Sequence, residues 1–325
     1  MCHEAFEALL REAPQYGRQA AAICKTADTC VYFGQKTAWL SSGEAFFTAI
    51  LKDLEEAKHS IFLEFYHIHP GVLWNSVVKI LYKKAAAGVD VRLVYDRFGC
   101  LFSKSYRKKL ASMHIGCTAF PENRNHRRRL VIDDRIAYVG AIDLADEALG
   151  LNGKYGQWKD GAIRMEKGSL SEPYGYLVPF LDAPGRQMGR DALYALFSGA
   201  KRSIAIMTPC FLPDDILFHC LYHAARSGVQ VTVVVPARSA DRRSHTLLSQ
   251  LVSRGAAVVT YPSGMLHTRV YCADEEAAVV GTFKLDHQSL YRQYGNGVWL
   301  YGHGAVRDIV CDIRETIAVC HPMEI

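Results

Sequence analysis

Residues 125–133 read NHRRRLVID, and residues 266–274 read LHTRVYCAD. Both stretches follow the pattern H-x-R-x4-D. Side chains two residues apart share one face of an extended strand, so each histidine projects beside an arginine. A histidine next to a permanent cation suits chemistry on an anionic group, because the cation holds the anion while the imidazole attacks it or moves a proton. The pattern therefore predicts four catalytic residues: His126, Arg128, His267 and Arg269.

The two stretches belong to a longer repeat. The sequence AKHSI at 57–61 returns as AKRSI at 200–204, and AGVDV at 87–91 returns as SGVQV at 227–231. With the histidines included, the offset stays between 140 and 143 residues. An offset this constant indicates an internal duplication. Helix-like and strand-like segments alternate within each copy, which predicts an α/β protein of two similar lobes, each a mixed sheet flanked by helices.

The predicted organisation has three parts: an amino-terminal lead-in (1–40), a first lobe (41–175) and a second lobe (176–325). Glu172-Pro173 and Ala183-Pro184-Gly185 interrupt the periodicity between the lobes. The lead-in contains a helix-like stretch that could lie on a membrane surface, but its weak apolar face favours packing against the protein.

Composition narrows the functional classes. The chain has 325 residues, a net charge of +5 and ten cysteines without C-x2-C spacing, so no zinc site is expected. No apolar run is long enough to cross a bilayer, and the first residues lack an export signal. These features favour a cytoplasmic protein, peripherally attached if its substrate is a bilayer lipid. The mild charge, without repeated basic and aromatic interleaving, argues against nucleic acid as a partner.

The two motifs resemble the H-x-K-x4-D signature of the phospholipase D superfamily, and the chain is most similar to bacterial cardiolipin synthases. Further segments carry the resemblance, which covers about residues 30–320: YDRFG at 95–99, YGQWKD at 155–160, TPCFLPD at 208–214 and LDHQSL at 285–290. The resemblance implies two lobes meeting at one active site that uses neither metal nor cofactor. One histidine would form a phosphohistidine, and the other would protonate the leaving alcohol and deprotonate the incoming one.

The resemblance further implies a phosphatidyltransferase that converts phosphatidylglycerol, a phospholipid, to cardiolipin and glycerol. It favours His126 as nucleophile and His267 as general acid and base. Arg128 and Arg269 would clamp the phosphate oxygens. Asp160 would orient a catalytic histidine.

Five positions depart from the family pattern. Arg128 and Arg269 replace lysines, Asp143 and Lys284 replace asparagines, and Gly295 stands where the second lobe should carry a carboxylate. We expect Asp143 to repel a phosphodiester and Lys284 to supply an ammonium lost at the arginine positions. These departures keep open a second hypothesis, a phosphate- or phospholipid-binding protein with impaired turnover. A metal-independent nuclease is the third and least favoured.

The aspartates that close the two motifs lie on the opposite strand face from the histidines. Asp133 and Asp274 are therefore expected to support the site structurally, by bonding nearby backbone or arginine, rather than to act in catalysis.

Overall fold

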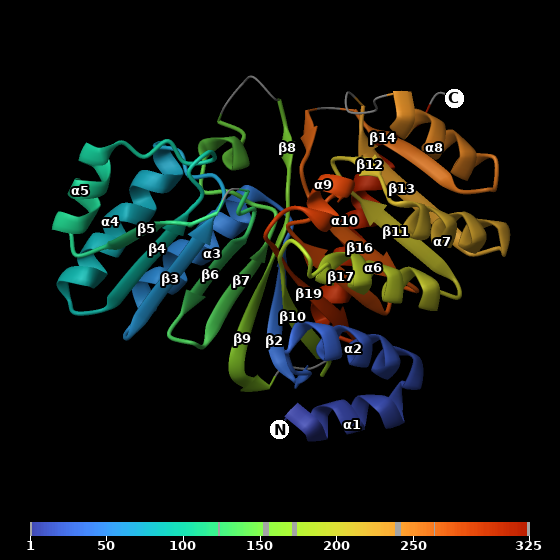
Figure 1. Cartoon of the computed structure of the whole chain (residues 1–325), viewed down its shortest axis with the longest axis horizontal. Coiled ribbons are helices and arrows are strands. Elements are labelled where there is room, and N and C mark those ends of the chain that lie inside the picture. The colour runs from blue at the N-terminus through green and yellow to red at the C-terminus, as the bar shows by residue number, and fades with distance from the viewer. Residues whose placement is uncertain are drawn as a thin grey trace.

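The computed structural model describes residues 2–122, 124–151, 156–170, 174–237, 242–262 and 264–323. Two α/β lobes lie side by side (Figure 1). The first is built on a seven-stranded sheet of order β2-β9-β7-β6-β3-β4-β5, and the second on a nine-stranded sheet of order β1-β10-β19-β17-β16-β11-β13-β14-β20. Each sheet combines parallel and antiparallel pairs. The predicted class, two similar lobes with mixed sheets flanked by helices, is confirmed.

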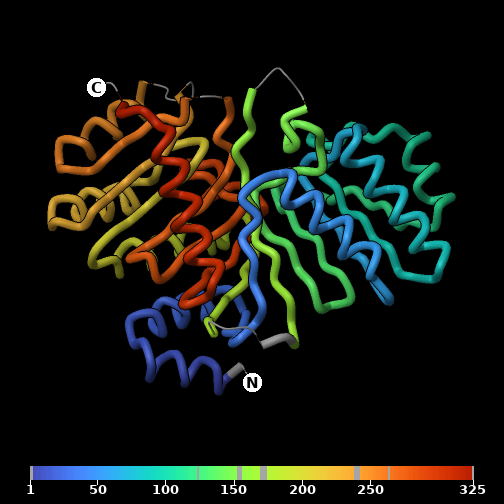
Figure 2. Tube along the Cα trace, turned by 180° about the vertical axis from the view of Figure 1, so that it is seen from behind, coloured from blue at the N-terminus to red at the C-terminus, as the bar shows by residue number. Residues whose placement is uncertain are grey.

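The first lobe follows the predicted alternation of strands and helices. Its elements are β2 (Gln35–Leu40), α3 (Gly43–Glu56), β3 (Ser60–Phe65), α4 (Val72–Ala86), β4 (Asp90–Tyr95), α5 (Lys104–Ser112), β5 (Gly116–Ala119), β6 (Arg128–Ile132), β7 (Ile136–Gly140), the 3-10 helix η1 (Asp146–Leu149), β8 (Trp158–Lys159) and β9 (Ala162–Leu170). Figure 2 shows the helices of this lobe over the back of its sheet.

The second lobe repeats that order with additions at its edges. Its elements are β1 (Tyr32–Phe33), β10 (Tyr176–Asp182), α6 (Met188–Gly199), β11 (Ser203–Met207), β12 (Phe211–Leu212), α7 (Asp215–Arg226), β13 (Gln230–Pro236), α8 (Arg242–Val252), β14 (Ala257–Tyr261), β15 (Met265–Leu266), β16 (Val270–Ala273), β17 (Ala277–Gly281), β18 (Leu285–Asp286), α9 (His287–Tyr291), β19 (Gly295–Tyr301), α10 (Gly304–Ala318) and β20 (His321–Pro322). The predicted break at Glu172-Pro173 lies outside the described residues.

Local sequence explains how the strand that follows the first histidine is placed. Along β6, Arg128, Leu130 and Ile132 are buried while the alternating residues are only partly covered. The two apolar side chains join the core beneath α3 and α4. Since side chains alternate between the faces of a strand, this burial directs Arg128 to the same side as the core.

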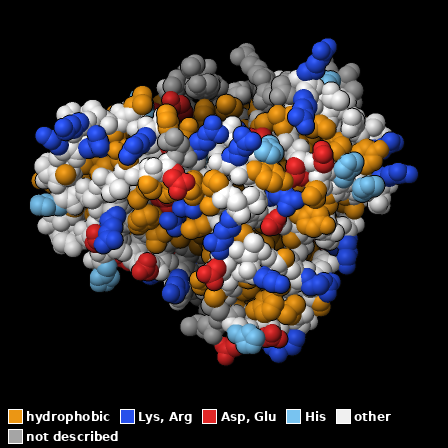
Figure 3. Space-filling model, in the orientation of Figure 1, with side chains coloured by type: hydrophobic (Ala, Val, Ile, Leu, Met, Phe, Trp, Pro, Cys, Tyr) orange, Lys and Arg blue, Asp and Glu red, His pale blue; other side chains and the backbone are white. Residues whose placement is uncertain are grey.

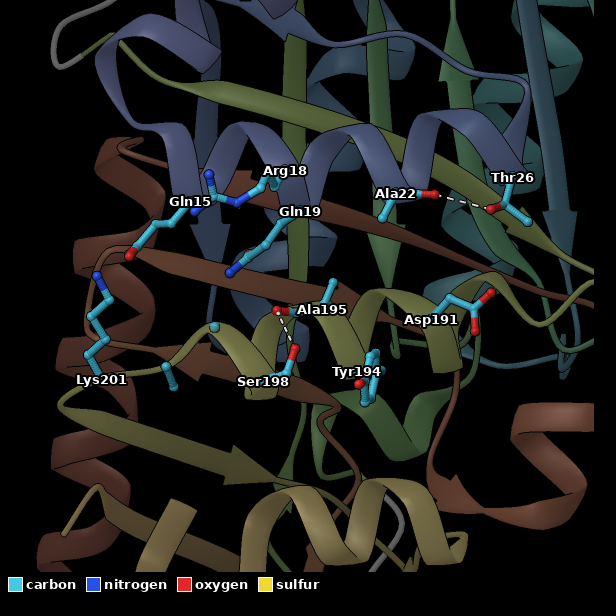
Figure 4. Close-up of a pocket in the computed structure, with 12 residues that line it drawn as sticks. Gln15, Arg18, Gln19, Ala22, Thr26, Asp191, Tyr194, Ala195, Ser198 and Lys201 are labelled. Atoms are coloured by element: carbon cyan, nitrogen blue, oxygen red, sulfur yellow. Dashed lines mark hydrogen bonds between the residues drawn. The ribbon is translucent and has the colours of Figure 1, made fainter. Parts of the chain in front are cut away.

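The lead-in packs on the second lobe. It forms α1 (Cys2–Glu12) and α2 (Pro14–Ala27), and α2 lies against α6 and β10. Tyr16 donates a hydrogen bond to Glu276 at 2.8 Å, and the Trp299 indole donates to Gln19 at 3.1 Å. A cavity of about 620 Å³ remains between α2 and α6 (Figure 4). The two strands that follow separate, since β1 joins the second sheet and β2 the first.

Helix α10 joins the two lobes. Figure 2 shows it along the back of the second lobe, and it also contacts β2 of the first sheet. Its buried Asp312 accepts a hydrogen bond from the Trp39 indole at 3.1 Å and pairs with Lys159. Within the described parts of the chain, no helix is long and apolar enough to cross a membrane.

The duplication is visible in the strand register. Gly140 at the end of β7 pairs with Ala162, and Gly281 at the end of β17 pairs with Gly297. Counting back two residues from each partner, Asp160 in the first lobe corresponds to Gly295 in the second. The position read from the sequence as a missing carboxylate is therefore the structural equivalent of Asp160.

The aspartates that close the two motifs accept hydrogen bonds from the backbone that leads into a neighbouring strand. Asp133 accepts hydrogen bonds from the N–H groups of Lys58, His59 and Ser60 at 2.7–2.8 Å. Asp274 accepts the equivalent three from residues 201–203 at 2.6–3.1 Å. Both aspartates have left-handed backbone, with φ of 55°. These contacts agree with the expected structural role.

Removing the Asp274 carboxylate should therefore weaken the fold. Asp274→Ala is expected to lower the free energy of unfolding by about 2 kcal/mol, because three N–H donors lose a charged acceptor. Denaturant titration measures the change. Asp274→Asn is the matched control, since asparagine keeps one acceptor oxygen and tolerates the left-handed backbone. An unchanged unfolding midpoint for the alanine variant would contradict this role.

Candidate active site

The two motif histidines meet at the junction of the lobes, and each is held by the opposite lobe. The backbone N–H of His126 donates to the Tyr294 carbonyl at 2.8 Å, and that of His267 donates to the Lys159 carbonyl at 2.7 Å. These bonds are equivalent under the duplication. The structure thus brings the two motifs together at the junction of the lobes, the arrangement that the family resemblance implies.

His267 is oriented by a carboxylate from the first lobe. Its Nδ1 lies 2.7 Å from Asp160 Oδ2. Asp160 is fully buried and also accepts hydrogen bonds from the Trp158 indole and the Gly161 N–H. The carboxylate expected to orient a catalytic histidine is therefore placed on the histidine of the other lobe.

The other ring nitrogen of His267 faces a cation. Arg269 Nη2 lies 2.8 Å from His267 Nε2. A guanidinium can only donate, so Nε2 must accept, which places the proton on Nδ1 toward Asp160. Burial, and then Arg269, lower the pKa of His267, while Asp160 opposes them. His267 is thus a neutral imidazole with its lone pair on Nε2.

Arg269 carries N–H donors that no described residue satisfies. Its side chain is buried, and its Nε and Nη1 atoms have no partner among the described residues. Burial, and then Arg128, lower the pKa of Arg269 to about 10, so the group stays charged at neutral pH. Buried donors without a partner are costly, and an anion would satisfy them.

Arg128 makes a contact that the sequence reading did not anticipate. Its Nε and Nη2 donate to the two Asp143 oxygens at 2.7 and 2.8 Å, and its Nη1 donates to the His126 carbonyl at 3.2 Å. Burial opposes the charged form of both groups, but the pairing keeps the pKa of Arg128 raised and that of Asp143 lowered. Two departures from the family pattern therefore form one ion pair, and Asp143 has a cationic partner.

His126 has no equivalent of Asp160. Among the described residues, none hydrogen-bonds its ring nitrogens; the ring stacks instead on Tyr66, with centroids 3.8 Å apart and planes 14° apart. Burial, followed by Arg128 and Arg269, lowers the pKa of His126 to about 2, and Asp143 opposes them. The ligand-free ring is therefore neutral.

The space beside Gly295 belongs to another carboxylate. A Cβ added at Gly295 would lie 3.4 Å from Asp182 Oδ2 and 3.1 Å from Thr282 Oγ1. Asp182 accepts the Gly189 N–H through Oδ1, whereas its buried Oδ2 has no partner among the described residues. Burial raises the pKa of Asp182 to about 7, with the Gly189 N–H opposing.

Because its pKa is raised, Asp182 destabilises the folded protein when it is ionised. The folded protein binds the Asp182 proton more tightly than the unfolded chain does. The contribution of this proton to the free energy of unfolding is therefore complete below about pH 4 and is lost as pH rises through 7. At pH 8, Asp182→Asn should raise the free energy of unfolding by about 2–4 kcal/mol, an advantage that fades toward pH 4. Denaturant titrations of both proteins across this range test it; parallel profiles would rule it out.

Lys284 lies at the edge of the site. Its Nζ is 3.1 Å from Asp286, its side chain is 35% exposed, and its charge contributes to the lowered pKa of His126. Its expected role as a replacement cation stays a prediction.

Several residues that build the site were missed or only partly read from the sequence. Buried Asn125 donates its side-chain amide to Glu64 at 2.9 Å and its backbone N–H to Asp96 at 2.9 Å, which fixes the residue before His126. Asn296 brackets the Arg128 backbone with two hydrogen bonds. Nothing in the sequence around Tyr66 distinguishes it from an ordinary strand residue.

Comparison with known proteins agrees with this geometry. The family model described as "Cardiolipin synthase, PLD-like domain" matches residues 50–160 and 193–317, which include both motifs. A cardiolipin synthase of Alkalihalophilus pseudofirmus is 30% identical over 332 residues, covering 87% of this chain and 66% of that protein. A cardiolipin synthase of Geobacillus kaustophilus is 29% identical over 340 residues, covering 88% and 67%. The chain spans about two thirds of the length of these relatives.

Solved structures show the same fold. A phosphatidylserine synthase of Haemophilus influenzae superposes with a TM-score of 0.75 at 12% identity, covering 95% of this chain and 92% of that one. The resemblance seen in the motifs is confirmed by the match along both lobes: the chain belongs to the phospholipase D-like family of cardiolipin synthases.

Proposed function

We propose that this protein is a phosphatidyltransferase that transfers the phosphatidyl group of phosphatidylglycerol to a second phosphatidylglycerol, giving cardiolipin and glycerol. One observation supports the proposal most strongly. Arg269 Nε and Nη1 are buried and have no partner among the described residues, and Nη2 of the same guanidinium lies 2.8 Å from His267 Nε2. A phosphate that satisfies these donors would bring its phosphorus next to a nucleophile.

The geometry favours His267, not His126, as that nucleophile. Asp160 holds the proton on Nδ1 and would stabilise the cationic phosphohistidine. A general acid would instead need a proton on Nε2, where Arg269 already donates. This order reverses the one that the sequence favoured.

The proposed reaction has two displacements. In the first, His267 Nε2 bonds to phosphorus, the bond from phosphorus to the glycerol oxygen breaks, and His126 gives that oxygen a proton. In the second, a hydroxyl of the acceptor returns a proton to His126 as its oxygen attacks phosphorus and the phosphorus–nitrogen bond breaks. The anionic phosphate would offset the cations that keep ligand-free His126 neutral, so we expect the proton to arrive with the substrate.

Two observations support an alternative, a phospholipid-binding protein with impaired turnover. Among the described residues no carboxylate hydrogen-bonds the His126 ring, and Asp143 already pairs with Arg128. A nuclease is less favoured, because on the face that Figure 3 shows basic side chains are mixed with acidic and apolar ones.

The test uses phosphatidylglycerol vesicles in EDTA, with wild type beside His267→Ala, and mass spectrometry of the products. Cardiolipin plus glycerol from the wild type alone would support the transferase, and binding to these vesicles would support peripheral membrane contact. Phosphatidic acid would mean that water is the acceptor. Vesicle binding without product would favour the binding protein.

A further inference from the structure

Tyr66 contacts both predicted catalytic side chains of the first motif. Its ring stacks on His126 at 3.8 Å, and the Arg128 guanidinium carbon lies 5.5 Å from the centre of the same ring. Tyr66 follows directly after β3, and its carbonyl accepts a hydrogen bond from the Cys100 thiol at 3.2 Å. The chain at Gly99 also packs tightly against that carbonyl, because an added Cβ would lie 2.0 Å from it. The ring is therefore carried by a fixed segment of backbone.

Hydrogen bonds fix the backbone of His126, but they do not hold its imidazole ring. Asn125 bonds to Glu64 and Asp96, and the His126 N–H bonds to Tyr294. These contacts set the position of Cα and leave rotation of the ring free. In His267 a carboxylate removes that freedom, whereas at His126 the equivalent position is glycine.

We propose that Tyr66 is the positioning residue of His126, holding its ring by stacking and stabilising its protonated form where the second lobe lacks the carboxylate. The inference rests on the proposed function, because it assigns His126 the transfer of a proton. An imidazolium over the electron-rich face of an aromatic ring gains a cation–π interaction, which a neutral imidazole does not.

The surrounding charges explain why such help matters. Arg128 on β6, Arg269 before β16 and Lys284 before β18 all disfavour a proton on His126, and Asp143 after β7 favours it. Asp143 also pairs with Arg128, so its negative charge is divided between Arg128 and a protonated His126. The Tyr66 ring adds a contact that favours the cation without introducing another carboxylate beside the phosphate.

The test separates proton transfer from all other steps by changing the leaving group. Phosphatidylglycerol expels an alkoxide that needs a proton, whereas the p-nitrophenyl ester of phosphatidic acid expels a phenolate that does not. In single turnovers, Tyr66→Leu is expected to slow glycerol release about 3- to 30-fold. The p-nitrophenolate burst should keep the wild-type rate. Tyr66→Phe, which keeps the ring, should recover most of the loss, and Tyr82→Leu, an exposed tyrosine on α4, is the control.

Three results would overturn the proposal. Equal losses of rate with both donors would show that Tyr66 acts in folding or binding. Equal rates of glycerol release for Tyr66→Leu and wild type would show that the ring stack does not contribute to proton transfer. A Tyr66→Phe variant as slow as Tyr66→Leu would assign the effect to the hydroxyl. If the wild type gives no burst with either donor, the proposed function itself fails, and this role fails with it.

Discussion

His267→Ala is expected to abolish phosphoenzyme formation with every donor, a loss of about 10⁵-fold or more, as for removal of a covalent nucleophile. The reason is geometric. Of the two motif histidines, His267 is the one that, within the described residues, combines an orienting carboxylate, a lone pair on Nε2 and an adjacent cation with unsatisfied donors. Single-turnover release of glycerol and of p-nitrophenolate, from the two donors described above, measures the loss.

His126→Ala is the informative comparison. Loss of a general acid should slow glycerol release about 10²- to 10⁴-fold while leaving a p-nitrophenolate burst, because a phenolate departs unprotonated. The covalent intermediate should then accumulate on His267, where mass spectrometry of peptides can locate it. A phosphorylated His126, or a burst that survives in His267→Ala and is lost in His126→Ala, would restore the order that the sequence favoured.

The sequence was sufficient to predict what depends on chain order. Two motifs at a constant offset predicted two α/β lobes, a prediction that depends only on a repeated pattern. The structural role expected of Asp133 and Asp274 came from strand parity, although both residues lie just after their strands in left-handed backbone, where parity does not apply. The absence of a carboxylate at Gly295 was also readable, because the register of the repeat fixes that position.

The sequence could not predict which side chains meet across the lobes. Asp160 orients His267 from 107 positions away, and Tyr66 stacks on His126 although neither residue type is unusual in its segment. Such contacts depend on how the two sheets are placed, and no local periodicity encodes that. The sequence therefore predicted which side chains would gather at the site, and the contacts between the lobes lead us to propose a different assignment of their roles.

Arg128 and Asp143 are two departures from the family pattern that form a single interaction in the folded chain. Read singly, an arginine for lysine meant the loss of a compact ammonium, and an aspartate for asparagine meant repulsion of the phosphate. In the folded chain they form a bidentate, buried ion pair. The pair engages the Arg128 guanidinium, whereas Arg269 keeps Nε and Nη1 without a partner among the described residues, so we propose Arg269 as the group that binds the anion. The duplicated site has become asymmetric.

Breaking this pair should be costly. Asp143→Ala leaves the buried Arg128 charge without its carboxylate, and the free energy of unfolding is expected to fall by about 3–5 kcal/mol. The double variant Arg128→Lys/Asp143→Asn restores the residues of the family signature, and its unfolding free energy should lie well above that of Asp143→Ala, with turnover retained. Denaturant titration of Arg128→Lys, Asp143→Asn and their double variant gives the coupling energy between the two positions. Additive effects, or a loss below about 1 kcal/mol for Asp143→Ala, would mean that the pair is solvated and contributes little. A large coupling energy would show why the two substitutions occur together, because either one alone leaves the first lobe with an unmatched group.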